Sequence, residues 1–127
     1  MFDSFKSMGA VASLLKNKDQ IAAAGKRVQE RMEALRVTGE AGGGAVRATI
    51  TGKMRVESIH IEPAAARGFA ADEESRLMAQ ALITHAVNDG LIKAQEAMQA
   101  AIAAEADALG VPELADKLQG GLGGLLT

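Results

Sequence analysis

The chain has 127 residues, with 14 basic and 16 acidic side chains, three phenylalanines, and no cysteine, tryptophan or tyrosine. These counts correspond to one domain and exclude disulfides, thiolate metal sites and a cysteine nucleophile. They also argue against a surface that stacks the bases of single-stranded nucleic acid. No stretch approaches the roughly 20 apolar residues of a membrane-spanning helix, so we expect a cytosolic protein with no membrane partner.

The first predicted element is a helix from about Ala10 to Leu35. Its apolar seam repeats at every seventh position, at Leu14, Ile21, Val28 and Leu35. This pattern fits either an amphipathic helix that lies on a sheet or a seam that packs partly against a second chain. Gly25, in the middle of the helix, either permits close approach of another helix or is simply tolerated.

A glycine-punctuated β segment follows, with strands predicted over residues 36–40, 45–51 and 54–61. The middle strand alternates cleanly between apolar and polar residues from Val46 to Ile50. Val56 is out of phase with the rest of the third strand, and a bulge near Glu57 or Ser58 would restore the alternation. The segment is therefore predicted to be a three-stranded antiparallel meander with one buried face.

Residues 64–71 are predicted to be a connecting loop, and Asp72 is a good N-cap for a helix that continues to about Leu109. An unbroken helix of about 38 residues would span about 57 Å, longer than a globule of this size. It therefore breaks at Gly90, projects as an arm, or is covered by another chain. We expect one domain over residues 1–109, then a short helix and a flexible Gly/Leu-rich tail over 110–127.

Enzymatic chemistry has little support in the sequence. His60 and His85 fall on different elements, and His60 shares a strand face only with Glu62, which leaves at most two metal ligands. The Gly39–Gly44 turn lacks the Lys-Ser/Thr pair and the following helix of a phosphate-binding loop. We expect no catalytic activity, metal or cofactor, and a metal-dependent activity at His60 and Glu62 is the weaker alternative.

The net charge of −2 conceals an asymmetry, because residues 1–61 hold ten basic and six acidic side chains whereas residues 62–127 hold four and ten. A basic half can neutralise the phosphates of a DNA duplex, although a solvated polar face would carry the same charges. The candidate phosphate contacts are Lys16, Lys26, Arg27, Arg31, Arg47, Lys53 and Arg55. The Ala-rich, aromatic-poor core separately favours association of two chains.

The segment from Val37-Thr38-Gly39-Glu40 to the Ile59-His60-Ile61-Glu62-Pro63 run resembles the YbaB/EbfC family of bacterial nucleoid-associated proteins. Met1-Phe2, Asn88-Asp89 and the order of helix, three strands and long helix also match. The resemblance covers residues 1 to about 105. This sequence departs from the family pattern in two places. Its loop after Pro63 is longer, and Thr51-Gly52 stands where the family usually has an Asn-Gly turn.

The resemblance implies an α+β homodimer, intertwined or paired through its sheets, with helices that project as arms. It implies non-catalytic binding of double-stranded DNA in the nucleoid with little sequence specificity. The implied roles are nucleoid organisation, gene regulation and recombination or repair, with recombination or replication proteins as further partners. Candidate core and dimer residues are Val46, Ile50, Ile59, Leu77, Leu82 and Leu91. The alternative is a dimeric adaptor that holds a protein partner with its helical arms.

Overall fold

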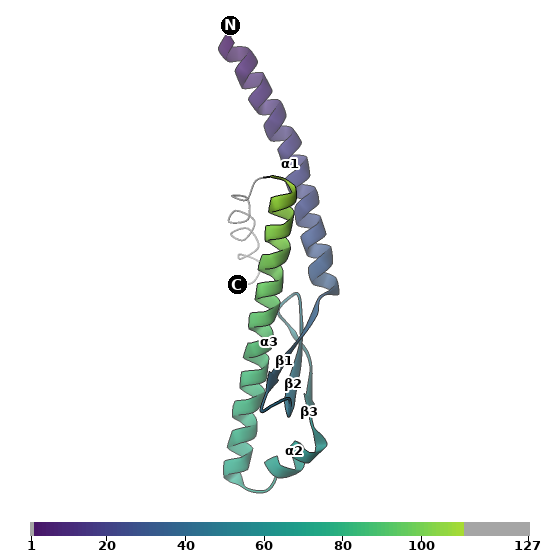
Figure 1. Ribbon diagram of the computed structural model, residues 1–127, viewed down its shortest axis with the longest axis vertical. Coiled ribbons are helices and arrows are strands. Elements are labelled where there is room, and N and C mark those ends of the chain that lie inside the picture. Colours follow the sequence, from purple (N-terminus) through teal and green to yellow (C-terminus); the bar gives the residue numbers. More distant parts are fainter. Residues whose placement is uncertain (1, 111–127) are drawn as a thin grey trace.

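The computed structural model describes residues 2–110, with side chains from residue 18 onward, and combines two long helices with a small sheet (Figure 1). The elements are α1 (Phe2–Ala34), β1 (Arg36–Ala41), β2 (Val46–Thr51), β3 (Val56–Ile61), α2 (Pro63–Phe69) and α3 (Glu73–Ala108). The α+β class and the order of the main elements confirm the sequence prediction. The predicted helix and tail beyond residue 110 lie outside the described residues.

The sheet is an antiparallel meander with the strand order β1-β2-β3, and α3 packs against β1 and β2. Val46 and Ile50 of β2 are fully buried on the face turned toward α3. Thr49 pairs with Ser58 whereas Ile50 pairs with Val56, so Glu57 is the extra residue of a bulge. This confirms the predicted bulge, which brings Val56 onto the face of β3 that carries its isoleucines.

The long helix α3 is unbroken through Gly90 and has 36 residues, about 54 Å at 1.5 Å per residue. A Cβ atom at Gly39 would collide with the backbone of Ala86 and Gly90, and one at Gly90 would collide with the side chain of Ile50. The break at Gly90 that we considered is therefore wrong. Gly90 allows the backbone of α3 to lie directly on β1 and β2, and the helix runs on past the sheet (Figure 1).

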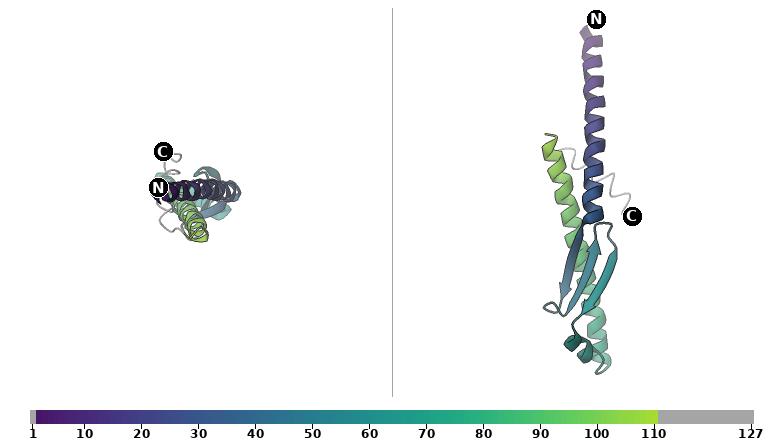
Figure 2. Two further views of the ribbon diagram at one scale, coloured as in Figure 1. Left: turned by 90° about the horizontal axis from the view of Figure 1, so that it is seen from above. Right: turned by 90° about the vertical axis from the view of Figure 1, so that its right-hand side faces the viewer.

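The helix α1 packs on α3 rather than on the face of the sheet. Val28 and Met32 form a second core with Met98 and Ile102 of α3. The N-terminal part of α1 extends well beyond the end of α3 in two perpendicular views (Figures 1 and 2). A Cβ atom at Gly25 would meet nothing within 4 Å among the described residues, so this glycine makes no close helix contact within one chain.

Three predicted boundaries are wrong. The first helix begins at Phe2 rather than Ala10. The predicted loop contains α2, which Pro63 opens at a position where its missing N–H costs no hydrogen bond. The third strand begins at Val56 rather than Met54, because the backbone of Met54 is left-handed, with φ of 62°, and ends a tight turn.

Candidate nucleic-acid interface

Arg27 and Arg31 of α1 converge on one carboxylate of α3. The Nε and Nη2 atoms of Arg27 lie 3.0 and 2.9 Å from Oε2 of Glu105, and Nη2 of Arg31 lies 3.9 Å from Oε1. Glu105 is 5% exposed, whereas both arginine side chains are at least half exposed. The hydrogen bond from Arg27 lowers the pKa of Glu105 below its ordinary value of 4.5, although burial opposes this shift.

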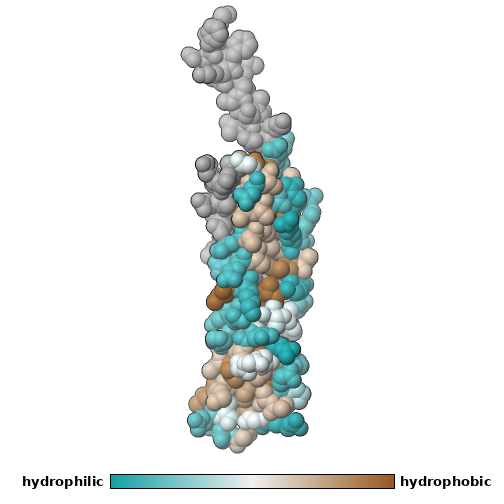
Figure 3. All heavy atoms as spheres, viewed as in Figure 1, coloured by the Kyte–Doolittle hydropathy of each residue, from teal (hydrophilic) through white to brown (hydrophobic). Residues whose placement is uncertain are grey.

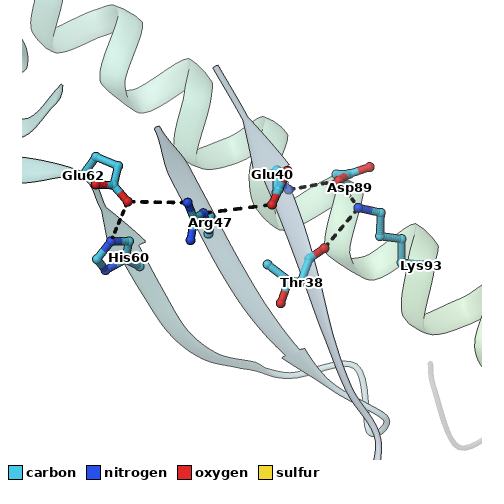
Figure 4. A network of polar contacts seen from close by, with 7 residues as sticks. All are labelled: Thr38, Glu40, Arg47, His60, Glu62, Asp89 and Lys93. Carbon is cyan, nitrogen blue, oxygen red and sulfur yellow. Dashed lines mark hydrogen bonds and ion pairs between the residues drawn. The ribbon is translucent and has the colours of Figure 1, made fainter. Parts of the chain in front are cut away.

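Arg47 lies between two glutamates on the face of the sheet turned away from α3 (Figure 4). Its Nη2 atom lies 3.6 Å from Oε1 of Glu62, and its Nε atom lies 4.0 Å from Oε1 of Glu40. The same Glu62 oxygen lies 3.1 Å from Nε2 of His60. These contacts surround the guanidinium of Arg47 with negative charge, which competes with any phosphate for this side chain.

Arg36, which sequence reasoning did not single out, closes the C-terminal end of α1. Its Nη1 atom donates hydrogen bonds to the carbonyl oxygens of Leu35 at 2.8 Å and Glu33 at 3.1 Å. Its Nε atom donates to Glu57 at 2.8 Å. A cation at this position satisfies orphan carbonyls and opposes the negative end of the helix dipole.

Lys53 and Arg55 project from the β2–β3 turn, which is anchored at the base of α1. The amide of Gly52 donates to the carbonyl of Leu35 at 3.2 Å. The hydroxyl of Thr51 accepts hydrogen bonds from the amides of Lys53 and Arg55, both at 3.3 Å. Thr51 thus supplies a side-chain acceptor in the turn where the family pattern has Asn.

The remaining predicted phosphate contacts lie on α1. Lys26 is exposed, two residues from the buried Val28, and therefore lies on the side of the helix turned away from α3. The side chain of Lys16 lies outside the described part of the chain. Among the residues that the structure describes, no carboxylate lies within 4.0 Å of the charged groups of Lys26, Lys53 or Arg55.

The six candidate core and dimer residues divide by burial. Val46 and Ile50 are fully buried within one chain, and Leu82 and Leu91 pack partly buried against the same core. Ile59 is 43% exposed and Leu77 is 54% exposed. Apolar side chains accordingly reach the molecular surface between hydrophilic ones (Figure 3).

The apolar face of β3 is the least covered part of the sheet. Val56 and Ile59 point to the same side as the buried residues of β2 but are 45% and 43% exposed. The cause is the position of α3, which packs against β1 and β2. The sequence predicted one buried face for the whole meander, but on β3 only Ile61 packs against the core within one chain.

The outer edge of β1, in contrast, is closed by α3 (Figure 4). Oδ2 of Asp89 accepts a hydrogen bond from the amide of Glu40 at 3.0 Å. Nζ of Lys93 lies 3.0 Å from the same Asp89 oxygen and donates to the carbonyl of Thr38 at 3.1 Å. The amide of Glu40 and, secondly, Lys93 lower the pKa of Asp89 below its ordinary value of 3.8.

His60 and Glu62 contact each other, but the described side chains contain no group of three or more His, Cys, Asp or Glu that could hold a metal ion. Neither α1 nor α3, as far as the structure describes them, is apolar enough to cross a membrane.

The sequence profile of the YbaB/EbfC DNA-binding family matches residues 8–109, and the chain belongs to this family. The family is one of nucleoid-associated DNA-binding proteins and is not a known enzyme family. The match spans α1, the sheet, α2 and α3, and so includes both the closed edge of β1 and the turn that carries Lys53 and Arg55.

Two relatives carry the name nucleoid-associated protein. The protein of Afipia carboxidovorans is 31% identical over 107 residues, covering 84% of this chain and 97% of the relative. That of Acetivibrio thermocellus is 33% identical over 117 residues, covering 92% of this chain and 88% of the relative. A crystal structure of an uncharacterized Helicobacter pylori protein is 20% identical, with a TM-score of 0.48, and covers 68% of this chain and 82% of that one.

Proposed function

We propose that the chain forms a homodimer that binds double-stranded DNA through the phosphate backbone, with little sequence specificity. The observation that carries this proposal is the β2–β3 turn, which presents Lys53 and Arg55 beside the base of α1 in a chain of a DNA-binding family. Contacts to phosphates fix a protein on a duplex without reading its sequence. The expected setting is the nucleoid, in its organisation, in gene regulation, or in recombination or repair.

The dimer is proposed to form through β3. This strand is an edge of the sheet, and its Val56 and Ile59 leave an apolar strip uncovered. Antiparallel pairing of two β3 strands about a two-fold axis would extend the sheet to six strands and would place both copies of α3 on the same face. The apolar strips of the two chains would then lie together between the two helices.

Of the seven candidate phosphate contacts, the proposed ones are those that are described with their side chains and carry no ion pair there, namely Lys26, Lys53 and Arg55. Each is exposed. A cation already paired with a carboxylate releases fewer counterions when it meets DNA, because part of its charge is neutralised beforehand. Arg47 is therefore a weaker candidate than the sequence suggested, and Arg27 and Arg31 are already paired with Glu105.

Titration of a duplex at rising salt concentration tests the DNA proposal. Each neutralised phosphate contributes about −0.9 to the slope of log K against log salt. The K26A/K53A/R55A variant should therefore have a slope smaller in magnitude, by about 2.7 per chain, than that of the unmodified protein. The slope should stay the same for duplexes of unrelated sequence. Absence of binding by the unmodified protein at low salt would refute the proposal.

The adaptor alternative makes a different prediction for the same variant. If the arms hold a protein partner, K26A/K53A/R55A should leave partner capture intact, and the unmodified protein should show no salt-dependent binding to the duplex. This variant discriminates better than one that includes Arg27 and Arg31, because replacing those residues would also unpair the buried Glu105.

A further inference from the structure

The contact between α1 and α3 ends close to Glu105. The two helices run in opposite directions, and their shared core contains Met32 and Val28 of α1 with Met98 and Ile102 of α3. Toward the free end of this contact, Ala24 and Ala106 are both fully buried. Beyond that point α1 continues without α3 beside it (Figures 1 and 2). Residues 2–23 are called the α1 arm below.

The Arg27–Glu105–Arg31 cluster is the set of ion pairs that links the two helices among the described residues. Arg27 uses two of its nitrogen atoms on one Glu105 oxygen, and Arg31 approaches the other oxygen. If Arg27 moved to a phosphate, the nearly buried carboxylate would lose its main partner, which is energetically unfavourable. The arginines are therefore better suited to holding α3 than to binding DNA.

The cluster lies near the base of the α1 arm, so a small change in the angle between α1 and α3 moves the tip of the arm a long way. The α1 arm has 22 residues, about 33 Å of helix, so a rotation of about 10° at its base moves its tip by about 6 Å. That displacement is about half the width of the major groove of a DNA duplex. If these ion pairs were weakened, the position of the arm's tip would therefore vary by a distance comparable to the width of a DNA groove.

We propose that Glu105, through Arg27 and Arg31, fixes the direction of the α1 arm, so that these two arginines are positioning residues rather than phosphate ligands. The consequence for DNA affinity rests on the proposed function. The effect on the arm itself does not, because it concerns only the packing of α1 on α3.

The direction of the α1 arm relative to α3 is tested by measuring the distance between two spin labels. The chain has no cysteine, so S7C/Q99C places one label near the free end of the α1 arm and the other at an exposed position of α3. Pulsed electron paramagnetic resonance, with labelled chains diluted in unlabelled ones, should give a narrow distance distribution that E105Q broadens. The control E96Q removes the same charge at an exposed position of α3 and should leave the distribution unchanged. Equal distributions in E105Q and E96Q would overturn the proposal.

Duplex binding separates a positioning role from a phosphate-contacting role. E105Q frees two arginines, so if they were phosphate ligands this variant should bind DNA more tightly and with a steeper salt slope than E96Q. Positioning predicts the opposite, a several-fold weaker binding than E96Q with an unchanged slope. Tighter binding by E105Q would overturn the proposal, whereas absence of binding by the unmodified protein would count against the proposed function alone.

Circular dichroism would reveal whether E105Q fails to fold. In that case a milder variant, R27K, tests the same proposal. R27K keeps the positive charge but lacks the planar fork that meets Glu105 with two nitrogen atoms. It should broaden the label distances in the S7C/Q99C background. A narrow distribution in folded R27K, together with wild-type DNA affinity, would contradict the positioning role of Arg27.

Discussion

Asp89 of α3 accepts a hydrogen bond from the backbone amide of Glu40 at the outer edge of β1. With Lys93, which donates to the carbonyl of Thr38, it satisfies two backbone groups that would otherwise be free to pair with another strand. No comparable contact is found on the outer edge of β3 among residues 18–110. The sheet is thus closed at one edge and available at the other, which favours pairing of two chains through β3.

Replacing Asp89 with Asn should lower stability at neutral pH. The pKa of Asp89 is depressed in the folded chain, so its stabilisation is present above the ordinary value of 3.8 and is lost as the pH falls through the folded-state value. The free energy of unfolding in urea should therefore differ between D89N and the unmodified protein at about pH 7, and this difference should shrink as the pH falls below 3.8. A difference that does not shrink as the pH falls would contradict this account, and E96Q is the control.

Glycine-to-alanine substitutions in the two long helices should change the stability of the fold in opposite directions. G90A brings a methyl group against Ile50 and should destabilise the fold by about 1–3 kcal/mol. G25A meets nothing within 4 Å and should stabilise it by about 0.5–1 kcal/mol through helix propensity. Thermal and chemical unfolding of the two variants will compare them, and a stabilised G90A would show that α3 lies farther from the sheet than described.

A lysine at Ile59 should dissociate the proposed dimer without unfolding the chain. Ile59 is 43% exposed in one chain, so the lysine can reach solvent in the monomer, but between two β3 strands it would bring two charges into an apolar contact. The control S58K places the same residue on the opposite face of the same strand. Sedimentation should give about twice the 13.1 kDa chain mass for S58K and the monomer mass for I59K.

Lys53 and Arg47 should differ in their contributions to DNA binding. Lys53 has no carboxylate partner within the described part of the chain, whereas Arg47 lies between Glu40 and Glu62. K53A should reduce the magnitude of the salt slope by about 0.9 per chain, and R47A should leave the slope nearly unchanged. Fluorescence anisotropy with a labelled duplex at several salt concentrations measures both slopes. A larger loss for R47A would place the interface on the outer face of the sheet.

The periodic parts of the fold could be predicted from the sequence. The alternation of β2 identified its buried face, and the phase error at Val56 placed a bulge near Glu57 or Ser58, of which Glu57 is the extra residue. The seven residues of α2 were missed because a run of alanines has no apolar periodicity. Gly90 resembled a break because a glycine that ends a helix and one that allows close packing look alike in a sequence.

The site was less predictable because its ion pairs join residues far apart in the chain. Arg27 and Glu105 are 78 positions apart, so their pairing depends on how α1 packs on α3. One signal was present, since Glu105 follows Met98, Ala101 and Ile102 on the apolar stripe of α3. A charged residue on such a stripe indicates a buried partner, although the sequence does not say which one.

Met54 belongs to both hydrophobic cores, because it packs against the cluster between the sheet and α3 and against the cluster between α1 and α3. Local opening of either cluster would therefore expose part of the other. The amides of Ala24–Ala34 should exchange their hydrogens at rates close to those of β2, since both segments open in one cooperative unit. The base of α1 would then stay closed for as long as the sheet does.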